Sequence, residues 1–95
     1  MIEVMVRDDH IRISGHAGYA GLGKDIVCAG VSVLVQTLVK SINDLTDDRP
    51  EQEIAPGIFY MNIKSLSEQG KLLVDSFFIG ICGIAEAYPD SVRVI

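Results

Sequence analysis

The chain has 95 residues, of which 48% are hydrophobic and 22% charged. This composition excludes an intrinsically disordered protein, and the length predicts a single domain over residues 1–95. The formal net charge of −5 excludes the basic surface that a nucleic-acid-binding protein needs, so no direct nucleic-acid binding is expected.

The first part of the chain predicts two strands and a loop. Apolar and polar side chains alternate over residues 2–7, which is typical of a strand with one buried face. A tight turn at Asp8-Asp9 then leads to a second alternating strand over residues 10–14. Four glycines within residues 15–24 predict a flexible loop.

From Ile26 onward the apolar residues recur three or four positions apart, which predicts a helix to about Thr46. No uninterrupted apolar run approaches the roughly 18 residues that span a membrane, and the N-terminus has no signal pattern. We therefore expect a cytoplasmic protein without a membrane partner. Residues 47–57 contain two prolines and a glycine and predict a surface loop.

The remaining segments predict a strand, a helix and a short strand. Residues 58–63 are apolar on both faces, which favours a position inside the sheet. Ser65 and Glu68 form a capping box for a second helix that ends at Tyr88, and a last strand follows it. The predicted fold is α+β, a single small domain of order β-β-α-β-α-β, with two helices packed on one sheet.

The glycine-rich loop suggests a phosphate binder as one alternative. Residues 18–24 fit the pattern G-x-x-x-x-G-K of a phosphate-binding loop, after a strand and before a helix. The match fails at the next position, because Asp25 stands where a hydroxyl would hold magnesium. We expect no cofactor and no metal site, since the chain has no C-x-x-C pair.

The residues at the two ends of this loop indicate nucleophilic catalysis. His16 stands at its entrance, and Cys28 lies in the first turn of the next helix, where free amide groups favour a thiolate. An imidazole near a thiolate can pair with it and later protonate a leaving amine. Twelve residues of chain allow the two to meet but do not force them to. The other cysteine, Cys82, has apolar neighbours, which predict that it lies in the core.

Longer motifs carry a family resemblance. Gly15-His16-Ala17-Gly18, the string from Asp25 to Ser32 (DIVCAGVS) and the Ala85–Pro89 region resemble the ribosomal-processing cysteine protease family of Firmicutes, called Prp. The resemblance covers nearly the whole chain, and residues 47–66 are its least distinctive part.

The resemblance implies a cytosolic, homodimeric cysteine endopeptidase. Its substrate would be the N-terminal extension of large-subunit ribosomal protein twenty-seven, which carries paired aromatic residues ahead of the cut, so an apolar groove is expected. Cys28 would be the nucleophile and His16 the general base and acid. Ser32 lies one helical turn after Cys28 and would either support catalysis or be structural.

The resemblance also concerns Asp25 and the loop that precedes it. Asp25 would either orient His16 or cap the helix. The loop positions Gly15, Ala17, Gly18, Tyr19, Gly21, Leu22 and Gly23 would close over the substrate.

The main competing function is a non-catalytic ribosome-assembly or interaction module in which Cys28 is structural. An acidic run from Asp44 to Glu53 predicts a solvated flank that could steer a basic substrate.

Overall fold

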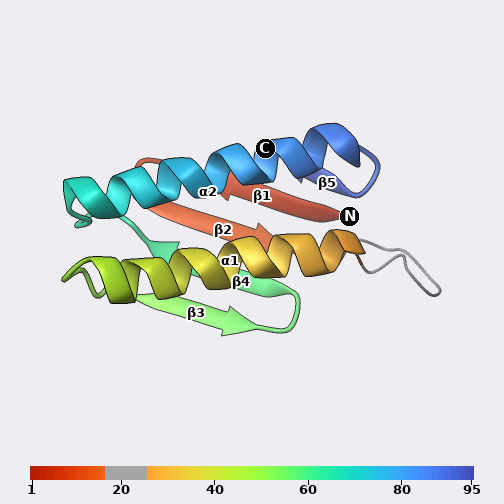
Figure 1. Ribbon diagram of the computed structural model, residues 1–95. Helices are drawn as coiled ribbons and strands as arrows, with labels where there is room; N and C mark the ends of the chain where they lie inside the picture. Colours follow the sequence, from red (N-terminus) through yellow and green to blue (C-terminus); the bar gives the residue numbers. More distant parts are fainter. Residues whose placement is uncertain (17–25) are drawn as a thin grey trace.

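The computed structural model describes residues 1–16 and 26–95. Its elements are β1 (Ile2–Val6), β2 (His10–Ser14), α1 (Ile26–Leu45), β3 (Gln52–Ala55), β4 (Ile58–Asn62), α2 (Glu68–Ala87) and β5 (Val92–Val94). Both helices lie on the same face of one five-stranded sheet (Figure 1). The predicted α+β fold with two helices on one sheet is confirmed.

The strand order in the sheet is β3-β4-β2-β1-β5. The neighbouring strands run antiparallel, except that β5 pairs with β1 in parallel. Strand β4 lies between β3 and β2, so its predicted position inside the sheet is confirmed. The turn at Asp8-Asp9 joins β1 to β2 as the sequence predicts, and it closes the hairpin in which Val4 lies opposite Ile13.

Strand β3 corrects the prediction of a loop over residues 47–57. The sequence gives no alternation there, because all four residues of the strand are exposed. The segment is extended because it forms a hairpin with β4, in which Ala55 lies opposite Ile58 across the Pro56-Gly57 turn. Pairing with a neighbouring strand, and not burial, therefore decides the conformation of this segment.

The core lies between the sheet and the helices. Its residues come from every strand except β3, from the segment between β4 and α2, and from one stripe of each helix, and the largest fully buried side chains are Ile11, Ile42, Met61 and Ile81. By length and composition alone α1 could span a membrane, a test that core helices of folded domains also pass. Five of its side chains, from Val27 to Ile42, are buried at helical spacing in this core, so we assign α1 to the core of the domain.

The start of α2 differs by two residues from the predicted capping box. Ser67, not Ser65, is the N-cap, and its hydroxyl oxygen accepts a hydrogen bond from the Gly70 N–H at 3.1 Å. The carboxylate of Asp48 accepts hydrogen bonds from both the amide and the hydroxyl of Ser67, at 3.0 and 2.7 Å. This contact spans 19 residues of chain, so the local sequence could not reveal which serine caps the helix.

The two helices pack closely where glycines face a neighbouring side chain. A Cβ at Gly80 would lie 2.8 Å from Leu34 of α1, and one at Gly30 would lie 3.2 Å from Ile84 of α2. Cys82 is half-buried and lies outside the buried core, so its prediction as a core residue is wrong. The preceding turn of α2 likewise exposes Ile79, because this side of the helix points away from the sheet.

Candidate active site

Two neighbouring elements bring His16 and Cys28 to one pocket. His16 lies two residues after the end of β2, and Cys28 is the third residue of α1. Both line a pocket of about 270 Å³ at the end of the sheet where β2 stops and α1 begins. The two residues that the sequence singles out are thus brought together, although nothing in their spacing required it.

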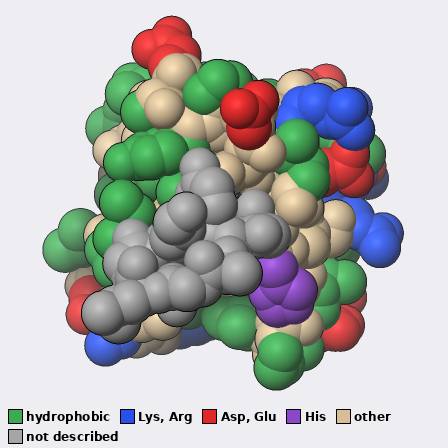
Figure 2. Space-filling view, turned by 90° about the vertical axis from the view of Figure 1, so that its right-hand side faces the viewer, with side chains coloured by type: hydrophobic (Ala, Val, Ile, Leu, Met, Phe, Trp, Pro, Cys, Tyr) green, Lys and Arg blue, Asp and Glu red, His purple; other side chains and the backbone are tan. Residues whose placement is uncertain are grey.

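The wall of this pocket is largely apolar. Its apolar side chains come from the sheet and from the inner face of α1, and they include Ile13, Val31, Val35, Ile54 and Phe59. Ser32 and Gln36, both exposed, add polar groups from α1. Ser32 therefore lies in the pocket together with Cys28, as the helical spacing predicts. Figure 2 shows this end of the molecule, where a histidine side chain is exposed among hydrophobic and polar surface.

The backbone around His16 is held from two sides. Gly15 adopts a φ of +98°, and its N–H donates a hydrogen bond to the carbonyl oxygen of Gly57 at 2.9 Å. The main-chain nitrogen of Met1 donates to the carbonyl oxygen of His16 at 2.6 Å. The residue itself is exposed, so its position depends on these main-chain contacts.

The imidazole of His16 lies against the turn between β3 and β4. A Cβ at Gly57 would lie 2.8 Å from Nε2 of His16, and Gly57 itself has a φ of +76°. Only glycine meets both conditions, because other L-residues strongly disfavour a positive φ. Gly57 thus supports one side of the histidine ring.

Sequence reasoning missed this turn as part of the site. Ile54, Ala55, Pro56 and Gly57 all line the pocket with the histidine and the cysteine. The Pro-Gly dipeptide predicts a turn, but it does not predict where this turn lies in the folded domain. Its location beside His16 follows from the pairing of β4 with β2, which places Ile58 opposite Ser14.

Part of the predicted site lies outside the described residues. This holds for Asp25, for the loop positions Ala17, Gly18, Tyr19, Gly21, Leu22 and Gly23, and for the predicted phosphate-binding segment 18–24. Within residues 1–16 and 26–95, no group of three or more His, Cys, Asp or Glu side chains is placed to hold a metal ion.

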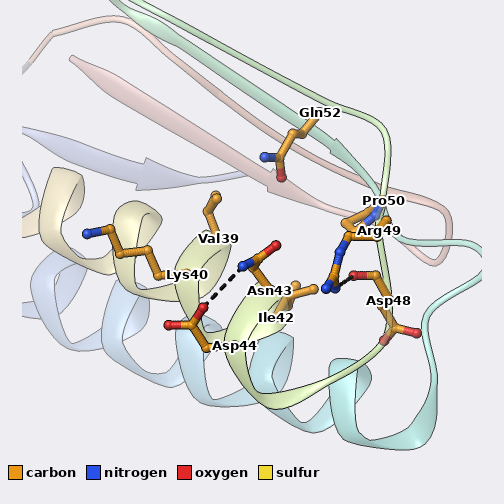
Figure 3. Close-up of a pocket in the computed structure, with 9 residues that line it drawn as sticks. All are labelled: Val39, Lys40, Ile42, Asn43, Asp44, Asp48, Arg49, Pro50 and Gln52. Carbon is orange, nitrogen blue, oxygen red and sulfur yellow. Dashed lines mark hydrogen bonds between the residues drawn. The ribbon is translucent and has the colours of Figure 1, made fainter.

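A second pocket of about 440 Å³ follows the first along α1 and β3. It is lined by Val39, Lys40 and Asn43 of α1 and by Gln52 of β3, whose side chain points toward the helix (Figure 3). The first pocket is lined by Val35 and Gln36, one turn earlier on the same helix, and by Ile54 on the same strand. Together the two pockets follow one side of α1.

The acidic run near the second pocket is mostly solvated, as predicted. Asp44, Asp47 and Glu53 are exposed, whereas Asp48 is half-buried. The hydrogen bond from the Ser67 side chain lowers the pKa of Asp48 below its ordinary value of 3.8, because this bond stabilises the charged carboxylate. This residue therefore belongs to the structure of the domain and not to a freely solvated flank.

Comparison with known proteins identifies a family. The model of the family described as cysteine protease Prp matches residues 1–93. The ribosomal processing cysteine protease Prp of Bacillus subtilis is 30% identical and covers 99% of this chain and 96% of its own length. That of Staphylococcus aureus is 26% identical, with 98% and 94% covered. The S. aureus Prp structure with a covalently linked product peptide superposes with a TM-score of 0.84, at 26% identity and with 98% and 94% covered.

Proposed function

The chain belongs to the cysteine protease Prp family, and we propose that it is an endopeptidase with Cys28 as nucleophile and His16 as general base and acid. We further propose that it removes the N-terminal extension of large-subunit ribosomal protein twenty-seven in the cytoplasm. The observation that carries the proposal is the pocket in which His16 and Cys28 lie together beside an apolar wall.

The proposed reaction uses these two side chains in turn. The imidazole of His16 takes the proton of the Cys28 thiol, and the sulfur attacks the carbonyl carbon of the scissile peptide bond. The C–N bond then breaks, and the imidazolium returns its proton to the leaving amine. Water next attacks the thioester and gives a proton to His16, and the sulfur leaves as thiolate and regains that proton.

The start of α1 suits the negative charge that develops during this reaction. Cys28 is the third residue of α1, in the first turn, where the backbone N–H groups of a helix point toward its N-terminal end. These amides and the positive end of the helix dipole can stabilise the oxyanion of the tetrahedral intermediate. In this proposal the exposed hydroxyl of Ser32 hydrogen-bonds the substrate, one turn further along the pocket.

Two findings support a peptide substrate of this kind. The S. aureus relative has been captured with a covalently linked product peptide, and its name describes ribosomal processing. The apolar lining, with Ile54 and Phe59, suits the aromatic residues that such an extension would place ahead of the cut.

We also propose a homodimer, supported by the apolar surface of the helices. Val33 of α1 and Ile79 of α2 are 61% and 75% exposed, and both helices lie on the same face of the sheet (Figure 1). Sedimentation of the Ile79→Lys variant tests this proposal. The wild type should sediment as a dimer and the variant as a monomer, and a monomeric wild type would contradict it.

Cleavage of a synthetic extension peptide tests the catalytic assignment. Cys28→Ala should abolish cleavage, and His16→Ala should lower kcat/KM by roughly 10²- to 10⁴-fold. Cys82→Ala is the matched control, since Cys82 lies outside the pocket, and it should cleave like the wild type. Circular dichroism checks that each variant folds. Cleavage that persists in folded Cys28→Ala would contradict Cys28 as the nucleophile, and a folded wild type that does not cleave the peptide would favour the non-catalytic interaction module.

A further inference from the structure

Strand β3 forms one edge of the sheet. It pairs with β4 on one side, and no other strand among residues 1–16 and 26–95 pairs with it on the other side. All four of its residues are exposed. An unpaired strand edge presents a row of N–H and C=O groups that can bind another extended chain.

The register fixes which groups point to this free edge. The Asn62 N–H donates to the Glu51 carbonyl at 2.8 Å, so these two opposite residues form a hydrogen-bonded pair. Hydrogen-bonded and non-hydrogen-bonded pairs alternate along an antiparallel ladder, and Glu53 is therefore also bonded to β4. The N–H and C=O groups of Gln52 and Ile54, which lie between these positions, point outward.

The same two residues connect this edge to the candidate active site. The side chain of Ile54 lines the pocket of His16 and Cys28, and that of Gln52 lines the second pocket (Figure 3). Beyond Ala55 the chain enters the turn that contacts the histidine ring. A peptide that pairs with this edge therefore runs along the apolar wall toward Cys28.

We propose that the substrate segment on one side of the scissile bond binds as an added strand on β3. It pairs with the main-chain groups of Gln52 and Ile54, and this inference rests on the proposed endopeptidase function. Pro50 and Pro56 flank the strand and limit pairing to these positions. The four residues of β3 span about 13 Å at about 3.3 Å per residue.

This geometry also determines which side chains the bound peptide should carry. Its side chains alternate between the two faces of the sheet. Those on the helix side enter the pocket beside Ile54, which favours apolar residues. Those on the opposite side lie beside the exposed carboxylate of Glu53, which shares that face with Tyr60 and favours basic residues. The edge therefore selects an extended peptide in which apolar and basic residues alternate.

N-methylation of the peptide tests the pairing in the wild-type protein. Each backbone N–H of the extension peptide is methylated in turn, and kcat/KM is measured for each peptide. Strand addition predicts losses of about three- to tenfold at every second position beside β3, because only alternate amides donate to the edge. Equal effects at neighbouring positions would overturn the proposal. If the unmodified peptide is not cut, the proposed function itself fails.

A pair of variants tests the same contact from the enzyme side. Ile54→Pro removes one outward N–H without touching the ladder to β4, and Ile54→Thr keeps it. The proline variant should lose about three- to tenfold more in kcat/KM than the threonine variant, with KM raised in particular. Equal kinetics in the two variants would overturn the proposal. So would a self-association of the wild type that Ile54→Pro abolishes while cleavage is unchanged, since the edge would then pair two copies of this chain.

Discussion

Gly57 offers the sharpest test of how the fold positions the histidine. An alanine at this position would place its Cβ 2.8 Å from Nε2 of His16, closer than such atoms approach in folded proteins, so the ring must move. The φ of +76° adds a cost of roughly 1–2 kcal/mol for an L-residue. For a domain of this size each kcal/mol lowers Tm by about 4–8 °C. Gly57→Ala should therefore melt about 5–15 °C below the wild type.

The same substitution should affect catalysis more than stability. A displacement of about 1 Å in a catalytic group can cost roughly 100-fold in rate, so we expect Gly57→Ala to lower kcat/KM by one to two orders of magnitude. Gly57→Asn separates the two effects, because asparagine tolerates a positive φ yet carries the same Cβ. It should melt closer to the wild type and still lose activity.

Two measurements decide the outcome. The chain has two histidines, so the ring Cε1–H signals of His10 and His16 can be followed separately by NMR. Only the signal of His16 should shift in the Gly57 variants. Gly83→Ala is the matched control, since its new Cβ meets nothing within 4 Å, and it should leave both the signals and the activity unchanged. A folded Gly57→Ala protein with wild-type kcat/KM and an unmoved His16 signal would show that Gly57 does not position the His16 ring.

Three further outcomes concern stability, each measured by thermal melting. Ser67→Ala removes the N-cap of α2 and should cost about 1 kcal/mol, whereas an unchanged Tm would show that the cap is dispensable. The Asp48 carboxylate has a lowered pKa, so its contribution is complete well above pH 3.8 and is lost as the pH falls through and below that value. The gap in Tm between wild type and Asp48→Asn should accordingly narrow from pH 6 toward about pH 2.5, and a constant gap would contradict this. The buried hydroxyl of Ser91 has no hydrogen-bond partner within the described part of the chain, so Ser91→Ala should leave Tm unchanged or raise it. A marked drop in Tm would show that the hydroxyl makes a stabilising hydrogen bond.

The fold was largely predictable because its signals are local. Alternation marks β1 and β2, and the helical stripe from Val27 to Ile42 marks α1, since each pattern records which side of an element faces the core. The family was also predictable, because the motifs around His16 and Cys28 are long and ordered. The family match over residues 1–93 confirms that resemblance.

The exposed strand and the helix cap were not predictable. Strand β3 buries none of its residues, so no hydrophobic pattern marks it, and only its pairing with β4 makes it extended. The choice of Ser67 over Ser65 as N-cap depends on Asp48, which is distant in the chain but adjacent in space. Interactions between residues that are distant in the chain cannot be recognised from a short stretch of sequence.

The amino-acid sequence alone was enough to predict the fold class, the family and the two residue types on which the proposed chemistry depends. The surroundings of those residues became known from the three-dimensional fold. The fold set His16 against Gly57, placed Cys28 beside an apolar wall, and left the edge of β3 next to them without a partner strand among residues 1–16 and 26–95. Patterns among residues close to each other in the chain reflect burial and local conformation, whereas a binding site forms where segments distant in the chain meet.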